Sequence, residues 1–391
     1  MSGPKVTVVG GGLGGLIAAT TCAEADAPVR LLEAQSRLGG RARSTTGDYR
    51  ANFGPHVVYA DGPLWAWLDE RGLTAGATRA PLRGLRFRHR GTVRRTPPRA
   101  FLDLHRLVRR PAPVDIDWHT WVLGRSGPTA ADMGAAACGV FAFDADPGRL
   151  SAEFARERLA RVLSLPPAAR YVPGGWTTLV ERVAAHARAA GVEIELRARV
   201  DELPEPPVVV ATELHSARVL LADDGLRCEG ARTVLLDVGL EARRGDPFIV
   251  WDLDEAGWAE RFSAPDPSVA PPGHSLLQAQ IGLRAGETLD EGVERLELLL
   301  DAGWSGWRER VAWRRRAVVD GRSGALDLPG STWRDRPRVE RGDGVFLCGD
   351  MVAAPGLLGE VSCTSAQVAA RGALAHLAAS RPRRSQPVSR S

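Results

Sequence analysis

Residues 6–15 read VTVVGGGLGG, a short apolar run followed at once by a glycine cluster. The run Val6–Val9 is typical of a buried parallel strand, and a helix of small residues is expected from Leu16 to about Glu24. The glycines between them fit the pattern G-x-G-x-x-G, which turns the chain sharply and leaves bare backbone for a pyrophosphate to approach. Free N–H groups at the start of the helix would attract the phosphates. The stretch therefore predicts a dinucleotide-binding βαβ unit.

A second strand is expected over residues 28–33, and its last residue is acidic, Glu33. An acid at this place accepts the ribose hydroxyls of an adenosine and disfavours a 2′-phosphate, so NADP is not expected here. A few residues later, Gly40 and Arg41 follow Gly39 and can bring backbone amides and a guanidinium to a second phosphate or to the edge of a flavin. A plain glycine turn and a surface arginine are the alternatives. The agreement of strand, helix and Glu33 favours the functional interpretation of both motifs.

A third motif lies near the C-terminus. The apolar run Val345–Cys348 predicts a buried strand, which is followed by Gly349 and Asp350. An aspartate there can accept hydrogen bonds from a ribityl chain, although an aspartate that only caps a turn is the simpler alternative. A helix is expected to begin near Ser362, and amides at its start, including that of Val361, would stabilise negative charge on a reduced flavin ring.

The middle of the chain has a different character. Residues 61–170 are expected to form a largely helical insertion, whereas residues 192–200 alternate strictly between apolar and polar side chains, as in a strand with one wet face. Further strands are expected over 234–238, 248–253 and 276–281. Because they follow one another along the chain, they indicate an antiparallel sheet.

Composition excludes several classes of protein. The 391 residues are 44% hydrophobic and 25% charged, with a net charge of +4 and basic residues spread along the chain, so no nucleic-acid partner is expected. The 5 cysteines are scattered and have no C-x-x-C spacing, which argues against a disulfide framework and against a metal site. No apolar run approaches the roughly 20 residues of a transmembrane helix. With no signal peptide ahead of the first strand, a cytoplasmic location is expected.

In this order and spacing, the three motifs resemble the flavin-containing amine oxidase and phytoene-desaturase-like superfamily. The stretches Asn52–His56, Pro173–Gly175 and Val208–Thr212 fit the same pattern. The resemblance implies FAD as the cofactor. It places the pyrophosphate at the glycine loop, the ribose at Glu33, and the ribityl pyrophosphate region at Asp350. The other residues that it assigns to FAD contact the phosphates, the adenine or the flavin ring: Gly10, Gly12, Leu13, Gly14, Gly15, Gly40, Arg41, Gly54, Pro55, Val200, Gly349, Val361 and Ser362.

These motifs predict an α/β fold class with a discontinuous, Rossmann-like FAD-binding domain and an inserted mixed α+β substrate domain. The FAD-binding domain is assigned to residues 1–60, 171–230 and 340–380, and the substrate domain to residues 61–170 and 231–339. The polar tail, residues 381–391, is expected to be disordered.

The sequence also departs from the amine oxidase pattern. The lysine that usually holds a water near flavin N5 has no counterpart, because Lys5 is the only lysine. No tyrosine lies in the C-terminal half to form an aromatic cage, for which Trp313 or Trp333 would have to substitute. Val361 and Ala366 stand where the family usually has glycine. These differences favour a desaturase-like or dehydrogenase reaction over amine oxidation.

Few residues are candidates for chemistry beyond cofactor binding. His56 follows the segment expected beside the flavin and is the first candidate for handling or orienting a proton, with a structural histidine as the alternative. Tyr59 is the second candidate. One of Gln278 and Gln280 could face the substrate, although solvent is the simpler destination. Arg316 could face an acidic substrate, or it could be one of many surface arginines.

The sequence therefore predicts an FAD-dependent oxidoreductase that takes hydride from a carbon of a small, lipophilic metabolite. Four alternatives stay open: an amine or amino-acid oxidase, a redox-neutral flavin isomerase, a binding protein on the same fold, and an NAD-only dehydrogenase. A small-molecule substrate is expected. The electron acceptor and the oligomeric state do not follow from the sequence.

Overall fold

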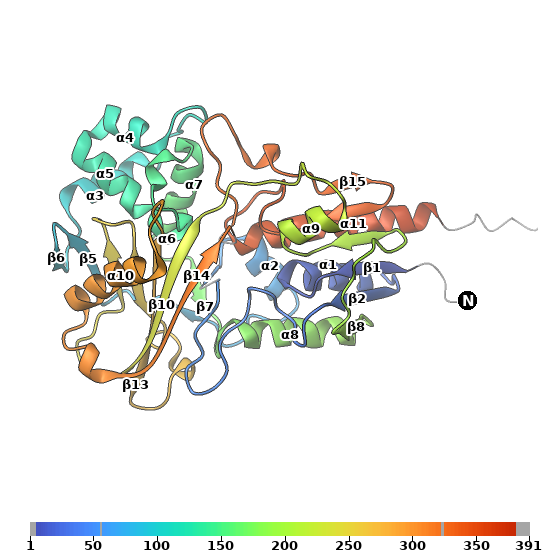
Figure 1. The fold of residues 1–391 in the computed structure, drawn as a ribbon, viewed down its shortest axis with the longest axis horizontal. Helices are drawn as coiled ribbons and strands as arrows, with labels where there is room; N and C mark the ends of the chain where they lie inside the picture. The colour runs from blue at the N-terminus through green and yellow to red at the C-terminus, as the bar shows by residue number, and fades with distance from the viewer. Residues whose placement is uncertain (1–4, 55–56, 322–323, 381–391) are drawn as a thin grey trace, which may run out of the picture.

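A parallel sheet forms one half of the molecule. The computed structural model describes residues 5–54, 57–321 and 324–380. Within these residues the first sheet has six strands in the order β15-β16-β9-β1-β2-β8 (Figure 1). All of its neighbours run parallel except the β15–β16 pair. The strands are β1 (Val6–Val9), β2 (Val29–Glu33), β8 (Glu193–Leu196), β9 (Val208–Val210), β15 (Glu340–Gly342) and β16 (Val345–Leu347).

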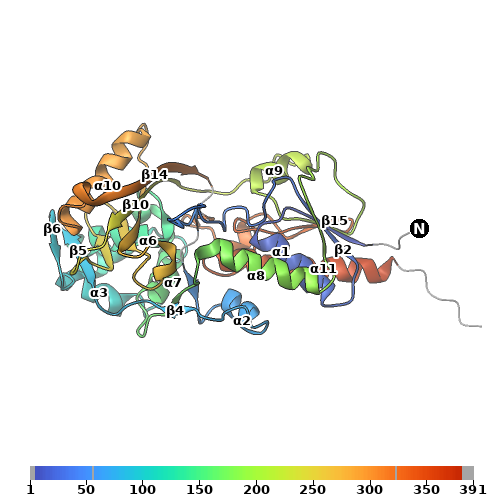
Figure 2. The same ribbon diagram turned by 90° about the horizontal axis from the view of Figure 1, so that it is seen from below.

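Helices cover both faces of this sheet, which explains its continuous apolar strands. Three helices pack together on one face, α1 (Leu13–Ala23), α8 (Gly175–Ala189) and α11 (Gly359–Ala379), while α9 (Leu214–Leu220) lies on the other (Figure 2). The strands β1 and β9 are valine-rich and buried throughout their length. This arrangement is the predicted Rossmann-like part of the fold.

A second, mixed sheet forms the other half. Its seven strands run in the order β14-β10-β13-β12-β11-β5-β6 among the described residues. They are β5 (Leu85–His89), β6 (Thr92–Arg94), β10 (Arg232–Glu241), β11 (Ile249–Asp252), β12 (Trp258–Arg261), β13 (His274–Gly282) and β14 (Val311–Asp320). The insertion 61–170 is largely helical, as expected, and it also supplies β5 and β6. The strands expected in this region form an antiparallel run, β10-β13-β12-β11, but the sheet as a whole is mixed and not antiparallel throughout, because β5 runs parallel to β11.

This second sheet is covered on both faces as well. On one face the helix α10 (Leu289–Gly303) packs against alternate residues of β10 and β13. On the other face lies a layer of short helices from the insertion (Figure 1). That layer consists of α3 (Arg99–Leu107), α4 (Trp118–Ser126), α5 (Pro128–Ala137), α6 (Gly139–Ala142) and α7 (Ala152–Val162). Because successive side chains of a strand point to opposite faces, each strand contributes to both cores.

A small sheet and a short helix lie at the junction. β7 (Ala169–Tyr171) pairs with both β3 (Val58–Tyr59) and β4 (Thr78–Arg79), and α2 (Pro63–Asp69) follows β3 along the chain. Tyr59 lies opposite Ala169 in the β3–β7 pair. Side chains two residues apart on a strand share a face, so Tyr59 and Tyr171 lie on the same face of this sheet.

Several element boundaries differ from the expectations. The strand expected over 192–200 ends at Leu196, because Arg197 adopts a left-handed backbone with φ of 57°. The last helix begins at Gly359, earlier than the expected start near Ser362. No described helix is long and apolar enough to cross a membrane, and no cluster of three or more His, Cys, Asp or Glu side chains within the described ranges could hold a metal ion.

Candidate active site

The glycine loop between β1 and α1 is tight on one side and open on the other. Gly10 has φ of 107°, and a Cβ atom at Gly15 would lie only 1.9 Å from the carbonyl oxygen of Gly10. Side chains are therefore excluded where the helix meets the strand. A Cβ atom at Gly12, by contrast, would meet no atom within 4 Å. The loop thus exposes bare backbone at the place where a pyrophosphate would approach.

The second motif lies directly beside the first. The amide of Gly39 donates a hydrogen bond of 2.7 Å to the carbonyl oxygen of Gly11. A Cβ atom at Gly40 would lie 3.5 Å from the Cα atom of Gly12 and, apart from its chain neighbours, within 4 Å of no other described residue. A Cβ atom at Gly54 would lie 3.5 Å from the carbonyl oxygen of Arg41. Gly12, Gly40, Arg41 and Gly54 are therefore gathered in one place.

Glu33 is fixed at the end of β2 by backbone amides. One carboxylate oxygen accepts from the amide of Gly11 and the other from the amide of Gln35, each at 2.7 Å. The carbonyl oxygen of Glu33 accepts from the amide of Ala198 at 2.9 Å, and Val200, two residues further on, packs against the core of this half. The structure therefore fixes Glu33 at the glycine loop and brings the segment that leads to Val200 against the end of β2.

Arg41 and Asp350 form a bidentate ion pair although 309 residues separate them. Their two hydrogen bonds measure 2.6 Å and 2.7 Å. Asp350 follows β16, so the third motif reaches the first two through the parallel sheet, where β16 lies two strands from β1. A planar guanidinium held by a carboxylate in this way has a fixed orientation toward a phosphate or a ring edge.

The start of α11 packs against the start of α1. A Cβ atom at Gly14 would lie 3.5 Å from both the carbonyl oxygen of Ser362 and the Sγ atom of Cys348. Val361 is buried in the protein interior. Glu360, in the first turn, accepts a hydrogen bond from the amide of Leu357 at 2.9 Å. The helix therefore carries its own acid at its N-terminus, a feature that the sequence motif did not reveal.

Comparisons with known proteins agree with this geometry. Residues 8–71 match the family described as an NAD(P)-binding Rossmann-like domain. A carotenoid 3,4-desaturase from Haloarcula japonica is 54% identical over 56 residues, which are 14% of this chain and span only 11% of that desaturase. Cyclohexylamine oxidase from Brevibacterium oxydans superposes with a TM-score of 0.73 at 16% identity, covering 96% of this chain and 100% of that one. The chain therefore shares its fold with this oxidase over nearly its whole length.

The same fold is found in an enzyme of a different kind. A reduced UDP-galactopyranose mutase superposes with a TM-score of 0.70 at 14% identity, covering 95% of this chain and 96% of that one. Likeness at this level of identity establishes the fold, and the predicted fold class is confirmed. The reaction has to be argued from the residues of the site.

A set of hydrogen bonds, called the clamp below, joins the second sheet to the segment that leads to Gly54. The side chain of Gln278 donates to the carbonyl oxygen of Asn52 at 3.0 Å and accepts from its amide at 3.1 Å. Arg315 donates to the same carbonyl oxygen at 3.0 Å. The expectation of solvent for Gln278 and Gln280 was wrong, since both are buried. Their alternation with apolar residues reflects two buried faces instead of one wet face.

The clamp is part of a row of polar side chains across the sheet. Strand pairing aligns Arg315 with Asp237, Asp237 with Gln278, and Gln278 with Glu260. Asp237 binds Arg315 at 2.6 Å and Gln278 at 2.8 Å, and burial raises the pKa of Asp237 although Arg315 opposes this. Glu260 accepts a short hydrogen bond from the hydroxyl of Tyr171. Sequence reasoning missed Asp237, Glu260 and Arg315, because only strand register shows that they are neighbours.

The remaining candidates are placed as follows. Pro55 and His56 lie outside the described residues, as does the tail 381–391. The ring of Tyr59 lies 4.9 Å from the guanidinium of Arg161, and burial raises the pKa of Tyr59. Arg316 is a surface residue that pairs with Asp290.

The suggested substitutes for an aromatic cage have other partners. Trp313 stacks on Tyr49 with 5.5 Å between ring centroids, and Arg334 lies over the ring of Trp333. Cys348 and Cys363 are buried free thiols, and burial raises the pKa of each to about 12.

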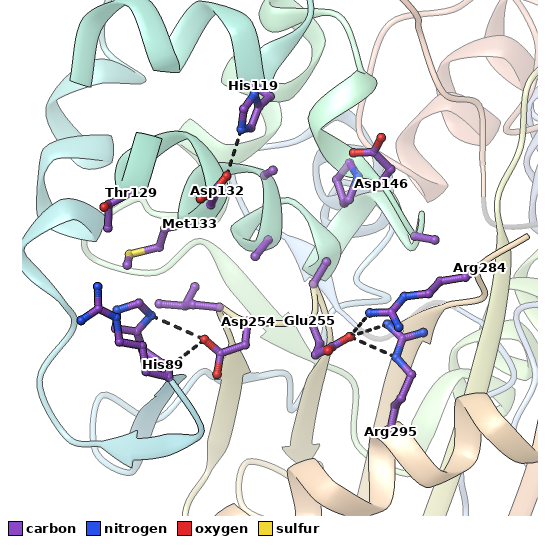
Figure 3. A pocket seen from close by; sticks show the side chains of 17 residues that line it. His89, His119, Thr129, Asp132, Met133, Asp146, Asp254, Glu255, Arg284 and Arg295 are labelled. Carbon is purple, nitrogen blue, oxygen red and sulfur yellow. Dashed lines mark hydrogen bonds and ion pairs between the residues drawn. The ribbon is translucent and has the colours of Figure 1, made fainter. Parts of the chain in front are cut away.

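A separate cavity of about 640 Å³ lies at the far end of the second sheet, and its lining includes none of the residues assigned to FAD. Figure 3 shows His119 pointing toward Asp132, His89 toward Asp254, and two arginines toward Glu255. Acids on its wall are thus balanced by neighbouring bases, and the cavity shows no preference for one sign of charge.

Proposed function

We propose that the chain is an FAD-dependent oxidoreductase that removes hydride from a carbon of a small, lipophilic molecule in a desaturation or dehydrogenation. The main support for this proposal is that three features meet around one loop: the open backbone at Gly12, Glu33 held by backbone amides, and the Arg41–Asp350 pair. These groups suit a dinucleotide with a second ring system beyond its phosphates. A nicotinamide dinucleotide alone would leave the Asp350 motif unexplained.

The residues present would hold FAD in a defined order. Glu33 would accept the ribose hydroxyls, the Gly10–Gly15 loop would donate to the pyrophosphate, and the Arg41–Asp350 pair would orient the ribityl side. Gly54, against the backbone of Arg41, would lie beside the ring. When bound, FAD would supply the acceptor for a hydride, while the protein orients the substrate and excludes water.

One observation supports a desaturase-like reaction on a lipophilic substrate. A stretch of 56 residues of this chain shares 54% identity with a carotenoid 3,4-desaturase.

Amine oxidation is the second candidate, because cyclohexylamine oxidase shares the fold over nearly the whole chain. The residues argue against it. Lys5, the only lysine, lies on the surface in an ion pair with Glu193, so no lysine can hold a water at the flavin.

The test begins with the visible absorption spectrum of the purified protein and the identification of the chromophore released by denaturation. Released FAD supports the proposal, and a colourless protein that FAD cannot reconstitute would contradict it and favour a binding protein. Anaerobic reduction of the bound flavin is then followed with a panel of carotenoids and of primary amines. Amine-dependent hydrogen peroxide would favour the oxidase, and turnover without an electron acceptor would indicate an isomerase.

A further inference from the structure

The buried acids of this protein fall into three kinds. Asp144, Asp237, Asp252, Asp327 and Glu360 are each paired with an arginine. Glu33 and Asp266 accept hydrogen bonds from backbone amides. Glu260 is equally buried, with 5% of its surface exposed, but within the described ranges neither a basic side chain nor a backbone amide pairs with it. Its hydrogen-bond partner is the hydroxyl of Tyr171, which is itself buried. A buried carboxyl with neither kind of partner is costly as an anion, and carboxyls perturbed in this way cluster at functional sites.

Glu260 also occupies a particular place in the fold. It stands next to Gln278 in the polar row, and adjacent strands of a sheet lie about 4.8 Å apart. Gln278 in turn holds both backbone groups of Asn52, two residues before Gly54. Glu260 is therefore one strand away from the clamp on the segment assigned to the flavin ring.

We propose that Glu260 is the group that exchanges the substrate proton, and that Tyr171 positions it. This assignment rests on the proposed function. In a dehydrogenation the substrate loses two hydrogens: one leaves with the electron pair as hydride to the flavin, and the other leaves as a proton, which forms a new O–H bond on the Glu260 carboxylate. The electrons of the broken bond to that second hydrogen remain in the new double bond of the product, so charge and atoms balance.

The surroundings of Glu260 suit this role. Burial raises its pKa to about 8, although the hydrogen bond from Tyr171 lowers it, so both protonation states are accessible near neutral pH. Tyr171 and Tyr59 face it from the small junction sheet, and burial raises the pKa of both, so both stay neutral. Tyr171 further lines a narrow cavity of about 10 Å³ shared with Asn52, a size that admits one water as a proton relay.

The first experiment needs no substrate. Infrared difference spectra of wild type between pH 6 and pH 10 should show a protonated carboxyl band that disappears with a midpoint near pH 8. Glu260→Gln should lack this band, and Tyr171→Phe should shift the midpoint upward because it removes the hydrogen bond that favours the carboxylate. Asp252→Asn, which removes a buried, arginine-paired acid from the neighbouring strand β11, is the matched control and should keep the band. A band that persists in Glu260→Gln overturns the proposal.

The second experiment uses the holoenzyme and the panel compound that reduces the wild-type flavin fastest. In Glu260→Gln, flavin content and reduction by dithionite should be normal, while the rate of reduction by the compound should fall by about 100-fold or more and lose its rise with pH. Tyr171→Phe should shift the pH profile in step with the infrared midpoint, and Asp252→Asn should keep the wild-type profile.

The outcomes separate this proposal from the proposed function. A wild-type protein without flavin would refute the proposed function and the assignment that rests on it. Normal flavin content in Glu260→Gln together with an unchanged rate and pH profile would refute the role of Glu260 alone. If Glu260→Gln does not fold, Tyr171→Phe decides: an unmoved pH profile would overturn the assignment.

Discussion

The two sheets of this protein handle charge in opposite ways. In the parallel sheet, Glu33 and Asp350 stand at or just beyond strand ends and are held by backbone amides or by a neighbouring loop arginine. In the mixed sheet, Asp237, Glu260 and Arg315 stand in the middle of strands, on the face toward the helical layer. Groups at strand ends remain available to a ligand, whereas Asp237 and Arg315 in mid-strand are fixed by each other and Glu260 is held by Tyr171. The first half is thus arranged to receive a cofactor and the second to constrain a few buried charges.

Gly15→Ala should have the largest effect, because it should prevent the parallel-sheet half from folding. The new Cβ atom would lie 1.9 Å from the carbonyl oxygen of Gly10, so β1 and α1 would have to separate, and we expect loss of cooperative folding as followed by circular dichroism. Gly12→Ala is the matched control. Its Cβ atom has free space, so the apoprotein should melt normally while FAD affinity falls. Equal melting temperatures for wild type and Gly15→Ala would refute this account of the loop.

Glu260→Gln tests the buried charge of the mixed sheet through the pH dependence of the free energy of unfolding. The folded pKa of Glu260 is raised from 4.5 to about 8, so the folded state binds the proton more tightly, and the free energy of unfolding falls as pH rises between these values. Wild type should lose roughly 4 kcal/mol from this group between pH 4.5 and pH 8, a loss that Glu260→Gln should not show. Urea unfolding at several pH values measures the difference, and parallel pH curves for the two proteins would contradict it.

Asp350→Ala tests the strand-end group of the first half. It removes both hydrogen bonds that orient Arg41. A hydrogen bond to a charged group contributes about 1.5–3 kcal/mol, so we expect the Kd for FAD to rise about 10- to 100-fold. Titration of the apoprotein with FAD, followed by flavin fluorescence, gives the value. Asp290→Ala, which removes the exposed partner of Arg316, is the control and should bind FAD as wild type does.

Thr288→Ala should have the smallest effect. It should lower the stability of the mixed-sheet half and leave cofactor binding unchanged. Thr288 caps α10 in a capping box with Glu291, so its loss should lower the free energy of unfolding by about 1 kcal/mol. FAD affinity should not change, because α10 packs on the face of the mixed sheet that points away from the polar row. A shift in FAD affinity would show that the two halves are not as separate as their charges indicate.

The difference between the halves also explains what could be predicted from sequence. The glycine loop, Glu33 and Arg41 lie in one N-terminal strand–loop–helix–strand region, and Asp350 lies in a short strand–loop–helix motif of its own near the C-terminus. Their convergence follows from a parallel sheet, in which strand ends meet at one edge. Residues could therefore be assigned from sequence where a short motif and the order of a parallel sheet determine their positions.

The polar row could not be predicted in this way. Asp237 and Arg315 are 78 residues apart, and only the register of β10 against β14 makes them partners. The strand β14 escaped recognition because its central run Arg314–Arg316 interrupts the apolar alternation, and the arginine-rich stretch of residues 80–116 concealed β5 and β6 in a similar way. Buried arginines paired with acids look like surface residues in a single sequence.

The pairing of Arg41 with Asp350 has a consequence for the order in which the protein can be made. The first partner is synthesised early, and its counterpart leaves the ribosome only after a further 309 residues. Throughout that interval β9 has no β16 beside it, and the edge that would hold the cofactor is unfinished. A nascent chain would thus complete its parallel sheet last, after every strand of the mixed sheet has already emerged.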